Sequence, residues 1–516
     1  METHFQTFDL YFLAAGFALA LLAIIFFVRG KIKLALLTLL CAALTFRLLA
    51  ALIDPFLHPW DEQYHALVAS NLANDPLHPV LYKDPALPYD PANWTGNHTW
   101  LHKPPLFLWQ MALSIKLFGL TPLAIRLPSV LLSVLMVAAV FRMGKLLHNE
   151  RTGFLAALLL ALSNMQINVV SGFLNTDQND VVFSAYVLLS FWAWTEYAFA
   201  AKRKWIVLTG VLAGAAILVK WLPGLLVFGG WGLALLLQRE WRRDKKRWLH
   251  FLSALLVTAM VALPWKIYSA LRWPLESKAV SEHFLKHVTE DLGHPGPWWF
   301  HFEQLAWQFG MVFALLLPAA FYIFYKKANH PALRIAYPAC IIFVFAFYSF
   351  VSTRMPLFCF IVSPLLILMN AVLLETLLQQ TARLKKAFAA TLTFLVLLFI
   401  SWNFFDIGRL EHFHTQREYW IGRERSCGMF NRVVAEKLKH KLPENTVVFN
   451  CGPNNPPSFM FFSGLTAYDF IPDSSTVARV KALHRPVAVF EHDLLPEFLK
   501  RDKEVMKLRP GLMSVK

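Results

Sequence analysis

Length, composition and charge exclude most soluble classes of protein. The chain has 516 residues, of which 57% are hydrophobic and 16% are charged, and its mean hydropathy is +0.47. Apolar runs of about twenty residues, the length that crosses a bilayer as a helix, recur along it. A net charge of +16 would suit a nucleic-acid partner, but the basic residues sit in short clusters between apolar runs, and no basic-aromatic binding module accompanies them. We therefore predict an all-α polytopic membrane protein with no nucleic-acid partner.

The hydrophobic pattern predicts about twelve transmembrane helices, each bounded by charge, proline or glycine. The first follows an N-terminus without a basic region or a small-residue cleavage site, which indicates a retained helix and not a signal peptide. The sixth and seventh are short, so a single broken hairpin is an alternative there. The predicted spans are residues 9–28, 34–53, 126–144, 154–173, 181–199, 206–220, 222–238, 249–268, 308–325, 335–351, 357–375 and 388–405.

Basic clusters set the predicted orientation. If twelve spans alternate, five clusters fall on one side, which the excess of Lys and Arg identifies as cytoplasmic. These clusters are residues 29–33, 202–204, 239–247, 326–327 and 383–386. The outer face then receives residues 54–125, 174–180, 269–307 and 352–356, together with everything after residue 406.

The first outer loop, residues 54–125, contains apolar stretches at 64–72 and 106–118 that are shorter than a span. They predict helices lying at the membrane surface. The first of them begins near Pro59 and ends near Asn74, and it places Asp61, Tyr64 and His65 at one-face spacing.

The apolar spans stop at residue 405, and short helices and strands alternate after it. This pattern predicts a small α/β domain over residues 406–516, separate from a transmembrane domain over 1–405. We expect strands at 446–451, near 468 and at 487–491, and helices at 419–440, 457–463 and 475–483. Cys427 and Cys451 are the two cysteines placed where a disulfide is conceivable, and the sequence leaves the bond open.

Four polar clusters fall on the predicted outer face, and together they supply carboxylates, cations and imidazoles. Transfer of a sugar from a lipid phosphate would need a carboxylate to take the acceptor's proton and cations to hold the departing phosphate. Such a donor carries a good leaving group, so no general acid is required, unlike in a glycosidase. The clusters are Asp61-Glu62, His102-Lys103-Pro104-Pro105, residues 175–180 and residues 281–299.

In this order, the clusters resemble motifs of the membrane glycosyltransferases of the GT-C fold that use polyprenyl-phosphate sugars. These include the aminoarabinose lipid A transferases and the protein O-mannosyltransferases. The resemblance covers about residues 55–360. The motifs that carry it are Trp60-Asp61-Glu62, His102-Lys103-Pro104-Pro105-Leu106, Arg126-Leu127-Pro128-Ser129, Asp177 or Asp180, Glu282-His283, His294-Pro295-Gly296-Pro297-Trp298 and Ser352-Thr353-Arg354-Met355-Pro356.

The resemblance implies an inverting glycosyltransferase of the bacterial inner membrane, with its active site and C-terminal domain on the periplasmic face. It would transfer a hexose or pentose from a polyprenyl-phosphate donor to a lipid, glycan or protein acceptor, and membrane lipids would surround it. It assigns catalytic roles to Asp61, the candidate base, and to Glu62 and Asp177.

For the donor phosphate, the resemblance implies the cations Lys103, Lys286 and Arg354. It places His102 and His283 where aminoarabinose transferases hold a divalent metal, which here would be Zn or Mg/Mn, although position 102 is an acid in those enzymes. Further site candidates are Tyr64, Asp180, Glu282 and His294.

Simpler roles remain open for these residues. Asp61 and Glu62 are also suited to the start of a helix, and Lys103 to anchoring at lipid head groups. For the whole chain, a twelve-span secondary transporter would require ionisable residues near mid-span, where only Arg47 and Lys220 are candidates. A non-catalytic lipid-binding scaffold would keep grooves for lipid but tolerate the loss of Asp61.

Overall fold

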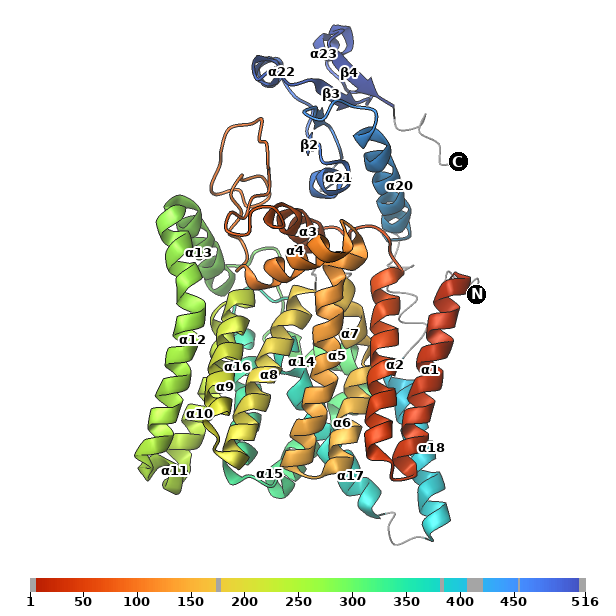
Figure 1. Cartoon of the computed structure of the whole chain (residues 1–516), viewed down its shortest axis with the longest axis vertical. Coiled ribbons are helices and arrows are strands. Elements are labelled where there is room, and N and C mark those ends of the chain that lie inside the picture. The colour runs from red at the N-terminus through yellow and green to blue at the C-terminus, as the bar shows by residue number, and fades with distance from the viewer. Residues whose placement is uncertain (1–5, 173–177, 381–384, 406–420, 453–454, 510–516) are drawn as a thin grey trace.

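Long apolar helices form the membrane part of the structure, a computed structural model that describes residues 6–172, 178–380, 385–405, 421–452 and 455–509 (Figure 1). Each of the twelve predicted spans coincides with one helix or with consecutive helical pieces. In chain order these are α1 (Thr7–Val28), α2 (Ile32–Leu52), α5 (Pro122–Leu147), α6 (Glu150–Leu162) with α7 (Asn164–Asn168) and η1 (Val169–Ser171), α8 (Asn179–Ala200), α9 (Arg203–Lys220), η2 (Leu222–Leu225) with α10 (Leu226–Leu237), α12 (Lys245–Arg272), α15 (Met311–Lys327), α16 (Pro331–Phe350), η3 (Phe358–Val362) with α17 (Ser363–Gln379), and α18 (Lys386–Phe404).

By length and composition alone, seven of the described helices could cross a membrane, or up to nine if two bent pairs each count as one span. The bent pairs are α6 with the α7–η1 segment, and α14 (Phe300–Phe309) with α15. Shorter apolar helices, including the η2–α10 piece, account for part of the difference from twelve. The predicted polytopic helical fold class is confirmed.

Local signals fix where the helices begin and how closely they pack. Thr121 caps α5 by accepting a hydrogen bond from the Ala124 amide, with Pro122 at the first helical position. At the α5–α6 contact, a Cβ added to Gly153 would lie 2.4 Å from the Phe141 carbonyl oxygen. The two backbones can therefore approach only because position 153 has no side chain.

Arg47 is fully buried inside the bundle, where it supports a break in a span. The chain bends by 57° between α6 and the α7–η1 segment, so the last carbonyls of α6 lack helical partners. The Arg47 guanidinium donates to the carbonyls of Leu160 and Ala161 at 3.1 and 3.0 Å, and to Ser133 Oγ at 2.6 Å. Arg47, one of the two charges that the sequence places near mid-span, therefore has a structural role.

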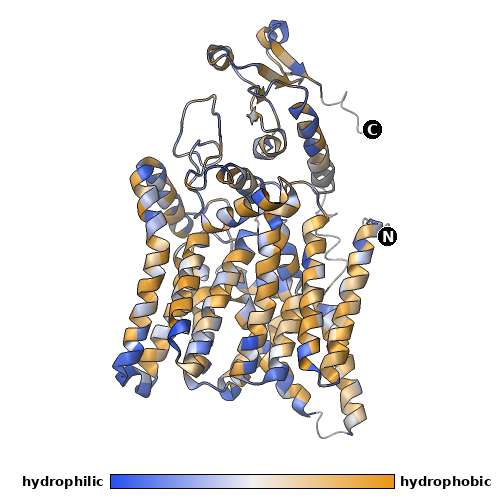
Figure 2. Ribbon diagram, in the orientation of Figure 1, coloured by the Kyte–Doolittle hydropathy of each residue, from blue (hydrophilic) through white to orange (hydrophobic). Residues whose placement is uncertain are grey.

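The polar parts of the chain gather at the two ends of the bundle (Figure 2). The described basic residues between spans, including α11 (Arg239–Arg243), lie at one end (Figure 1). At the other end lie α3 (Asp61–Leu72), α4 (Leu106–Phe118) and α13 (Pro274–Thr289), with the C-terminal domain beyond them. The two helices predicted in the first outer loop are confirmed as α3 and α4.

The C-terminal part is a small α/β unit with a four-stranded parallel sheet. The strand order is β2-β1-β3-β4, and the registers pair Val447 with Thr466, Val447 with Val487, and Val487 with Val505. Its elements are α20 (Ile421–Lys439), β1 (Val447–Phe449), α21 (Pro456–Ser463), β2 (Thr466–Ala467), α22 (Ser474–Ala482), β3 (Val487–Phe490), α23 (Glu497–Arg501) and β4 (Val505–Leu508).

Every predicted element of this unit is present, whereas α23 and β4 were not predicted. Cys427 and Cys451 are both free thiols, so the disulfide that the sequence left open is not formed. The predicted boundary at 405/406 adjoins residues 406–420, which lie outside the described residues.

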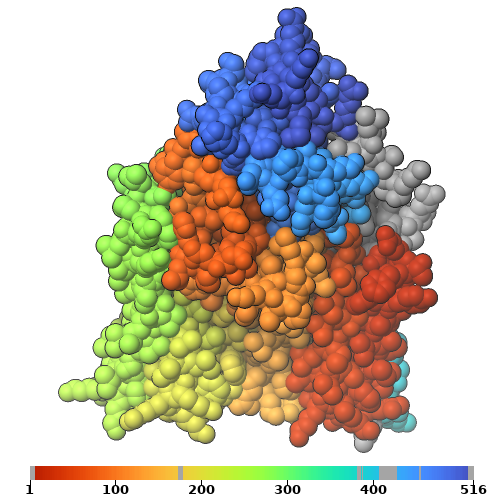
Figure 3. Space-filling model, turned by 45° about the horizontal axis from the view of Figure 1, so that its top comes forward, coloured from red at the N-terminus to blue at the C-terminus, as the bar shows by residue number. Residues whose placement is uncertain are grey.

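The C-terminal unit rests on the first outer loop (Figure 3). Tyr82 and Tyr468 stack with ring centroids 5.2 Å apart, and Tyr468 Oη accepts a hydrogen bond from the Ala86 amide. The carbonyl oxygen of Asp84 accepts hydrogen bonds from Thr466 Oγ1 at 3.0 Å and from Arg485 Nη1 at 2.7 Å. Helix α21 also packs on α3. The loop that carries the predicted acidic pair is thus held from outside the membrane.

Candidate active site

A buried ion pair anchors the start of α3. Arg126 Nε donates to Glu62 Oε1 at 2.7 Å and Nη2 to Oε2 at 2.9 Å, and both side chains are completely inaccessible to solvent. The remaining donors of Arg126 bind the carbonyls of Ala51, Asp54 and Phe56, at the end of α2 and just after it. The guanidinium therefore joins the end of α2 to the first turn of α3.

His58 completes this buried centre. Its backbone amide donates to Glu62 Oε2 at 2.7 Å, and its ring nitrogens lie 2.8 Å from Glu62 Oε2 and 3.1 Å from Asp54 Oδ2. Burial alone would raise the pKa of Glu62, but the charges of Arg126 and His58 lower it to about 2. Both oxygens of Glu62 are thus engaged inside the protein.

Asp61, the neighbouring residue, faces a different environment. It is the first residue of α3, whose N-cap is Trp60 and which has no side-chain cap, so Asp61 does not serve as the cap. Its side chain is 23% exposed, and Oδ2 lies 3.7 Å from Lys103 Nζ. Trp60 adopts φ 64° and ψ −128°, a conformation that favours glycine. Asp61 therefore lies partly exposed beside a cation, whereas the adjacent Glu62 is fully buried.

The electrostatics of Asp61 keep it ionised. Burial opposes its charge, but Lys103, with contributions from His65 and Lys220, outweighs burial and lowers the pKa of Asp61 below its ordinary value. Lys220, at the end of α9, forms an ion pair with Asp180 at the start of α8. A second lysine–carboxylate pair therefore lies near the first. Asp177 falls outside the described residues.

Imidazoles border the lysines. His102 is buried, stacks on Trp94 with ring centroids 4.4 Å apart, and lies 5.1 Å from the His283 ring. His283 in turn lies 5.0 Å from the ring of His287 on α13. Burial, followed by the charges of His283, Lys103, Lys220 and His294, lowers the pKa of His287 to about 4. Burial and neighbouring charge also lower the pKa values of His102 and His283. Burial therefore favours the neutral form of all three rings.

The imidazoles do not complete a metal site in the part of the chain that the structure describes. No group of three or more His, Cys, Asp or Glu side chains there is arranged to hold a metal ion. Catalytic zinc sites use three protein ligands, and His102 and His283 supply two. Metal binding at these residues stays a prediction.

The other predicted residues lie around this centre. Tyr64 is buried beside Trp94, with ring centroids 5.1 Å apart, and burial followed by the charge of Asp469 raises its pKa to about 12. Lys286 is exposed on α13. Glu282, also exposed on α13, lies 3.8 Å from Lys278. No ion pair among the described residues links Lys286 to Asp61.

Arg354 lies in a turn that is tied to the segment following α13. Its backbone amide donates to the carbonyl of His294 at 3.0 Å, and the Thr353 amide donates to that of His287 at 3.2 Å. Its guanidinium donates to the carbonyls of Ser349 and Ser352. The exposed His294 therefore helps to hold the turn through its main chain.

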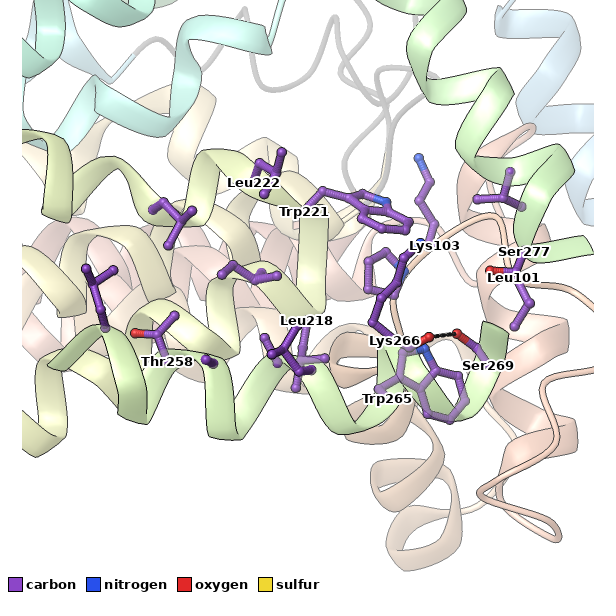
Figure 4. Close-up of a pocket in the computed structure, with 18 residues that line it drawn as sticks. Leu101, Lys103, Leu218, Trp221, Leu222, Thr258, Trp265, Lys266, Ser269 and Ser277 are labelled. Carbon is purple, nitrogen blue, oxygen red and sulfur yellow. Dashed lines mark hydrogen bonds between the residues drawn. The ribbon is translucent and has the colours of Figure 1, made fainter. Parts of the chain in front are cut away.

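An apolar pocket of about 460 Å³ opens beside Lys103. Its wall comes mainly from α9, η2 and α12, with Leu101, Lys103, Pro104 and α13 closing one end. Figure 4 shows Lys103, Lys266, Ser269 and Ser277 toward one end and Thr258 toward the other. The pocket thus joins a cationic end to an apolar body, the form that an anionic single-tailed lipid would fit. Lys266 was not among the predicted site residues.

Comparisons with known proteins bear on the fold of the chain. Residues 102–268 match the family model for dolichyl-phosphate-mannose-protein mannosyltransferase. The structure superposes on ArnT from Cupriavidus metallidurans bound to undecaprenyl phosphate with a TM-score of 0.63 and 16% identity, covering 86% of this chain and 87% of ArnT. The chain has the GT-C fold. The resemblance inferred from the motifs is confirmed at the level of fold.

Two further relatives extend the comparison. The undecaprenyl phosphate-alpha-4-amino-4-deoxy-L-arabinose arabinosyl transferase 1 of Pseudomonas fluorescens is 26% identical over 241 residues, which is 44% of this chain and 42% of that protein. The match thus spans less than half of the relative's length. The archaeal oligosaccharyltransferase AglB from Archaeoglobus fulgidus, solved with an inhibitory peptide and a dolichol-phosphate, superposes with a TM-score of 0.53 and 12% identity, covering 84% of this chain and 64% of AglB.

Proposed function

We propose that the chain is an inverting glycosyltransferase that moves one hexose or pentose from a polyprenyl-phosphate donor to a lipid, glycan or protein acceptor. The observation that carries the proposal is the Asp61–Lys103 pair at the cationic end of an apolar pocket. The GT-C fold supports it, as do the solved ArnT with bound undecaprenyl phosphate and the name of the Pseudomonas relative.

In the proposed reaction, the ionised Asp61 accepts the proton of the acceptor hydroxyl. The acceptor oxygen attacks the anomeric carbon from the face opposite the phosphate and forms the new glycosidic bond. The bond between that carbon and the phosphate oxygen breaks, and its electron pair leaves with the polyprenyl phosphate. The Lys103 ammonium stabilises the charge that develops on this leaving group. One displacement inverts the anomeric centre.

The remaining predicted residues keep supporting roles in the proposal. Glu62 positions Asp61 through Arg126, while Arg354 and Lys286 contact the donor phosphate once it is bound. Asp177 stays a predicted catalytic acid. Residues 1–405 form the transferase domain and 406–516 a periplasmic domain of a bacterial inner-membrane protein. This orientation is supported by the basic turns at the end of the bundle opposite α3.

The test compares wild type with Asp61→Asn. Both purified proteins are incubated with radiolabelled polyprenyl-phosphate sugars and a membrane extract, and transfer of label is measured. General-base catalysis contributes about 100-fold to 10,000-fold, so we expect a loss of that order in Asp61→Asn. Asp493→Asn changes an exposed aspartate of the C-terminal unit and serves as the matched control.

Two outcomes would count against the proposal. Equal transfer by Asp61→Asn and wild type would remove Asp61 as the base. No transfer by folded wild type with any donor would reject the glycosyltransferase and leave a transporter or a scaffold, which flux measurements in proteoliposomes would then separate.

A further inference from the structure

Three lysines lie at or near the cationic end of the pocket, and two of them have a carboxylate partner. Lys103 lies 3.7 Å from Asp61, and Lys220 forms an ion pair with Asp180. Lys266, on the pocket wall, differs: in the described part of the chain, no carboxylate lies within the 4.0 Å of an ion pair. A cation on an apolar wall near a membrane is costly in free energy unless an anion pairs with it. A bound ligand with a negative charge would supply this partner for Lys266.

The contacts of Lys266 hold it at the pocket but do not neutralise it. Its Nζ lies 4.1 Å from the centroid of the Trp221 ring and 3.5 Å from Ser281 Oγ. A cation over an indole face gains a modest attraction, which orients the ammonium without cancelling its charge. The ammonium therefore keeps donors available for a ligand.

Trp221 supplies a second, independent observation. It follows Lys220 at the end of α9 with φ 70° and ψ −154°, a backbone region that is almost reserved for glycine. Its indole Nε1 is buried and has no hydrogen-bond partner among the described residues. Buried indole N–H groups usually find an acceptor. Figure 4 shows Trp221 and Lys266 along the same pocket, close to Lys103.

We propose that Lys266 and Trp221 bind the phosphate of polyprenyl phosphate at the head of this pocket, with the polyprenyl tail along α9 and α12. This rests on the proposed function and adds two residues to its phosphate site. The donor's sugar-linked phosphate is a diester with one negative charge, whereas the released monoester carries about 1.5 to 2 negative charges at pH 7, as other phosphate monoesters do. In the proposed reaction Asp61 has taken the acceptor's proton by the time the monoester is released, so Lys103 has lost its counter-charge. Lys103 and Lys266 together then match the charge of the monoester.

This charge match also distinguishes the ligand from ordinary membrane lipids. A phospholipid such as phosphatidylglycerol is a phosphodiester with one negative charge and two acyl chains. Polyprenol has the same tail as polyprenyl phosphate and no charge. Binding at Lys266 should therefore favour the phosphate monoester over both.

The test measures equilibrium binding to the purified full-length protein in detergent. The ligands are undecaprenyl phosphate, undecaprenol, phosphatidylglycerol and inorganic phosphate, and the variants are Lys266→Met and Trp221→Phe. Lys278→Met, at an exposed lysine of α13 whose partner is the exposed Glu282, is the matched control. Thermal unfolding of each variant verifies that it is folded.

We expect wild type to prefer undecaprenyl phosphate to the other three ligands. Lys266→Met should weaken that binding by about tenfold to a hundredfold, as expected when a hydrogen bond to a charged group is lost, and Trp221→Phe should weaken it by about tenfold. Binding of undecaprenol should change little in either variant, and Lys278→Met should behave as wild type.

Unchanged binding of undecaprenyl phosphate by folded Lys266→Met and Trp221→Phe, with transfer intact, would overturn the inference and leave Lys266 as an interfacial anchor. Equal binding of phosphatidylglycerol and undecaprenyl phosphate by wild type would also overturn it. Failure of the proposed function gives a different result, because wild type would then show neither transfer nor a preference for undecaprenyl phosphate over undecaprenol.

Discussion

Asp61 and Glu62 are adjacent carboxylates that occupy opposite kinds of environment. Glu62 has no exposed surface and gives both oxygens to Arg126 and His58. Asp61 keeps 23% of its side chain exposed. Its Oδ2 lies 3.7 Å from Lys103 Nζ, a distance longer than a hydrogen bond. Because neighbouring residues on a helix point in different directions, one turn of α3 can carry both a structural anchor and a group that is open to a ligand. An acidic pair in a sequence therefore need not act as a pair.

The largest effect on stability should come from replacing Glu62 by its amide. The same change at Asp61 provides the comparison. Glu62→Gln leaves the buried guanidinium of Arg126 without its counter-charge, and breaking a buried pair in this way costs about 3–5 kcal/mol. Asp61→Asn disrupts a partly exposed contact worth less than about 1 kcal/mol. Unfolding of the two purified variants in detergent measures the difference. Equal stabilities would show that the buried centre does not hold α3.

The spans and the surface helices could be predicted because their signals are local. An apolar run ended by charge or proline marks a span, and Pro59 followed by one-face spacing predicted α3 within a few residues. The four-residue strand β4 was missed because Val505-Met506-Lys507-Leu508 is short and its pairing with β3 depends on distant residues. Strand pairing is decided by tertiary context more than by local sequence.

The site was predictable only in part. Asp61, Lys103, His102 and His283 belong to motifs, and the structure brings them close together. Lys266 was missed because a lysine near the end of an apolar run usually anchors that span at the interface, and only the fold shows that it lines a pocket. The Arg126–Glu62 pair joins residues 64 positions apart, which no local pattern reveals. Lys286 is exposed on α13, and its contact with the donor phosphate stays a prediction.

Because Asp61 lies partly exposed beside Lys103, its pKa should depend on the charge of Lys103. Lys103→Met removes the charge that offsets burial, so the pKa of Asp61 should rise and its basic form should require a higher pH. The acid limb of kcat/KM, which reports the free enzyme, should therefore move to higher pH than in wild type. The exposed Lys116 of α4 provides the control, Lys116→Met. An unmoved acid limb, even with reduced transfer, would mean that Lys103 does not set the ionisation of Asp61.

The smallest effect should come from the contact that holds the outer loop from the C-terminal unit. Arg485 donates to the carbonyl of Asp84 at 2.7 Å, to Thr466 Oγ1 at 2.8 Å and to the carbonyl of Asn445 at 2.9 Å. Arg485→Met removes all three bonds at a partly exposed site. We expect a loss of about 1–2 kcal/mol of stability, with transfer reduced less than about tenfold. Hydrogen exchange should quicken at the amide of Ala86, which bonds to Tyr468, while amides around the buried Glu62 keep their protection because Arg126 holds them independently. Arg479→Met, at an exposed arginine of α22, should leave both regions unchanged. Faster exchange around Glu62 in Arg485→Met would show instead that the buried centre depends on the outer contact.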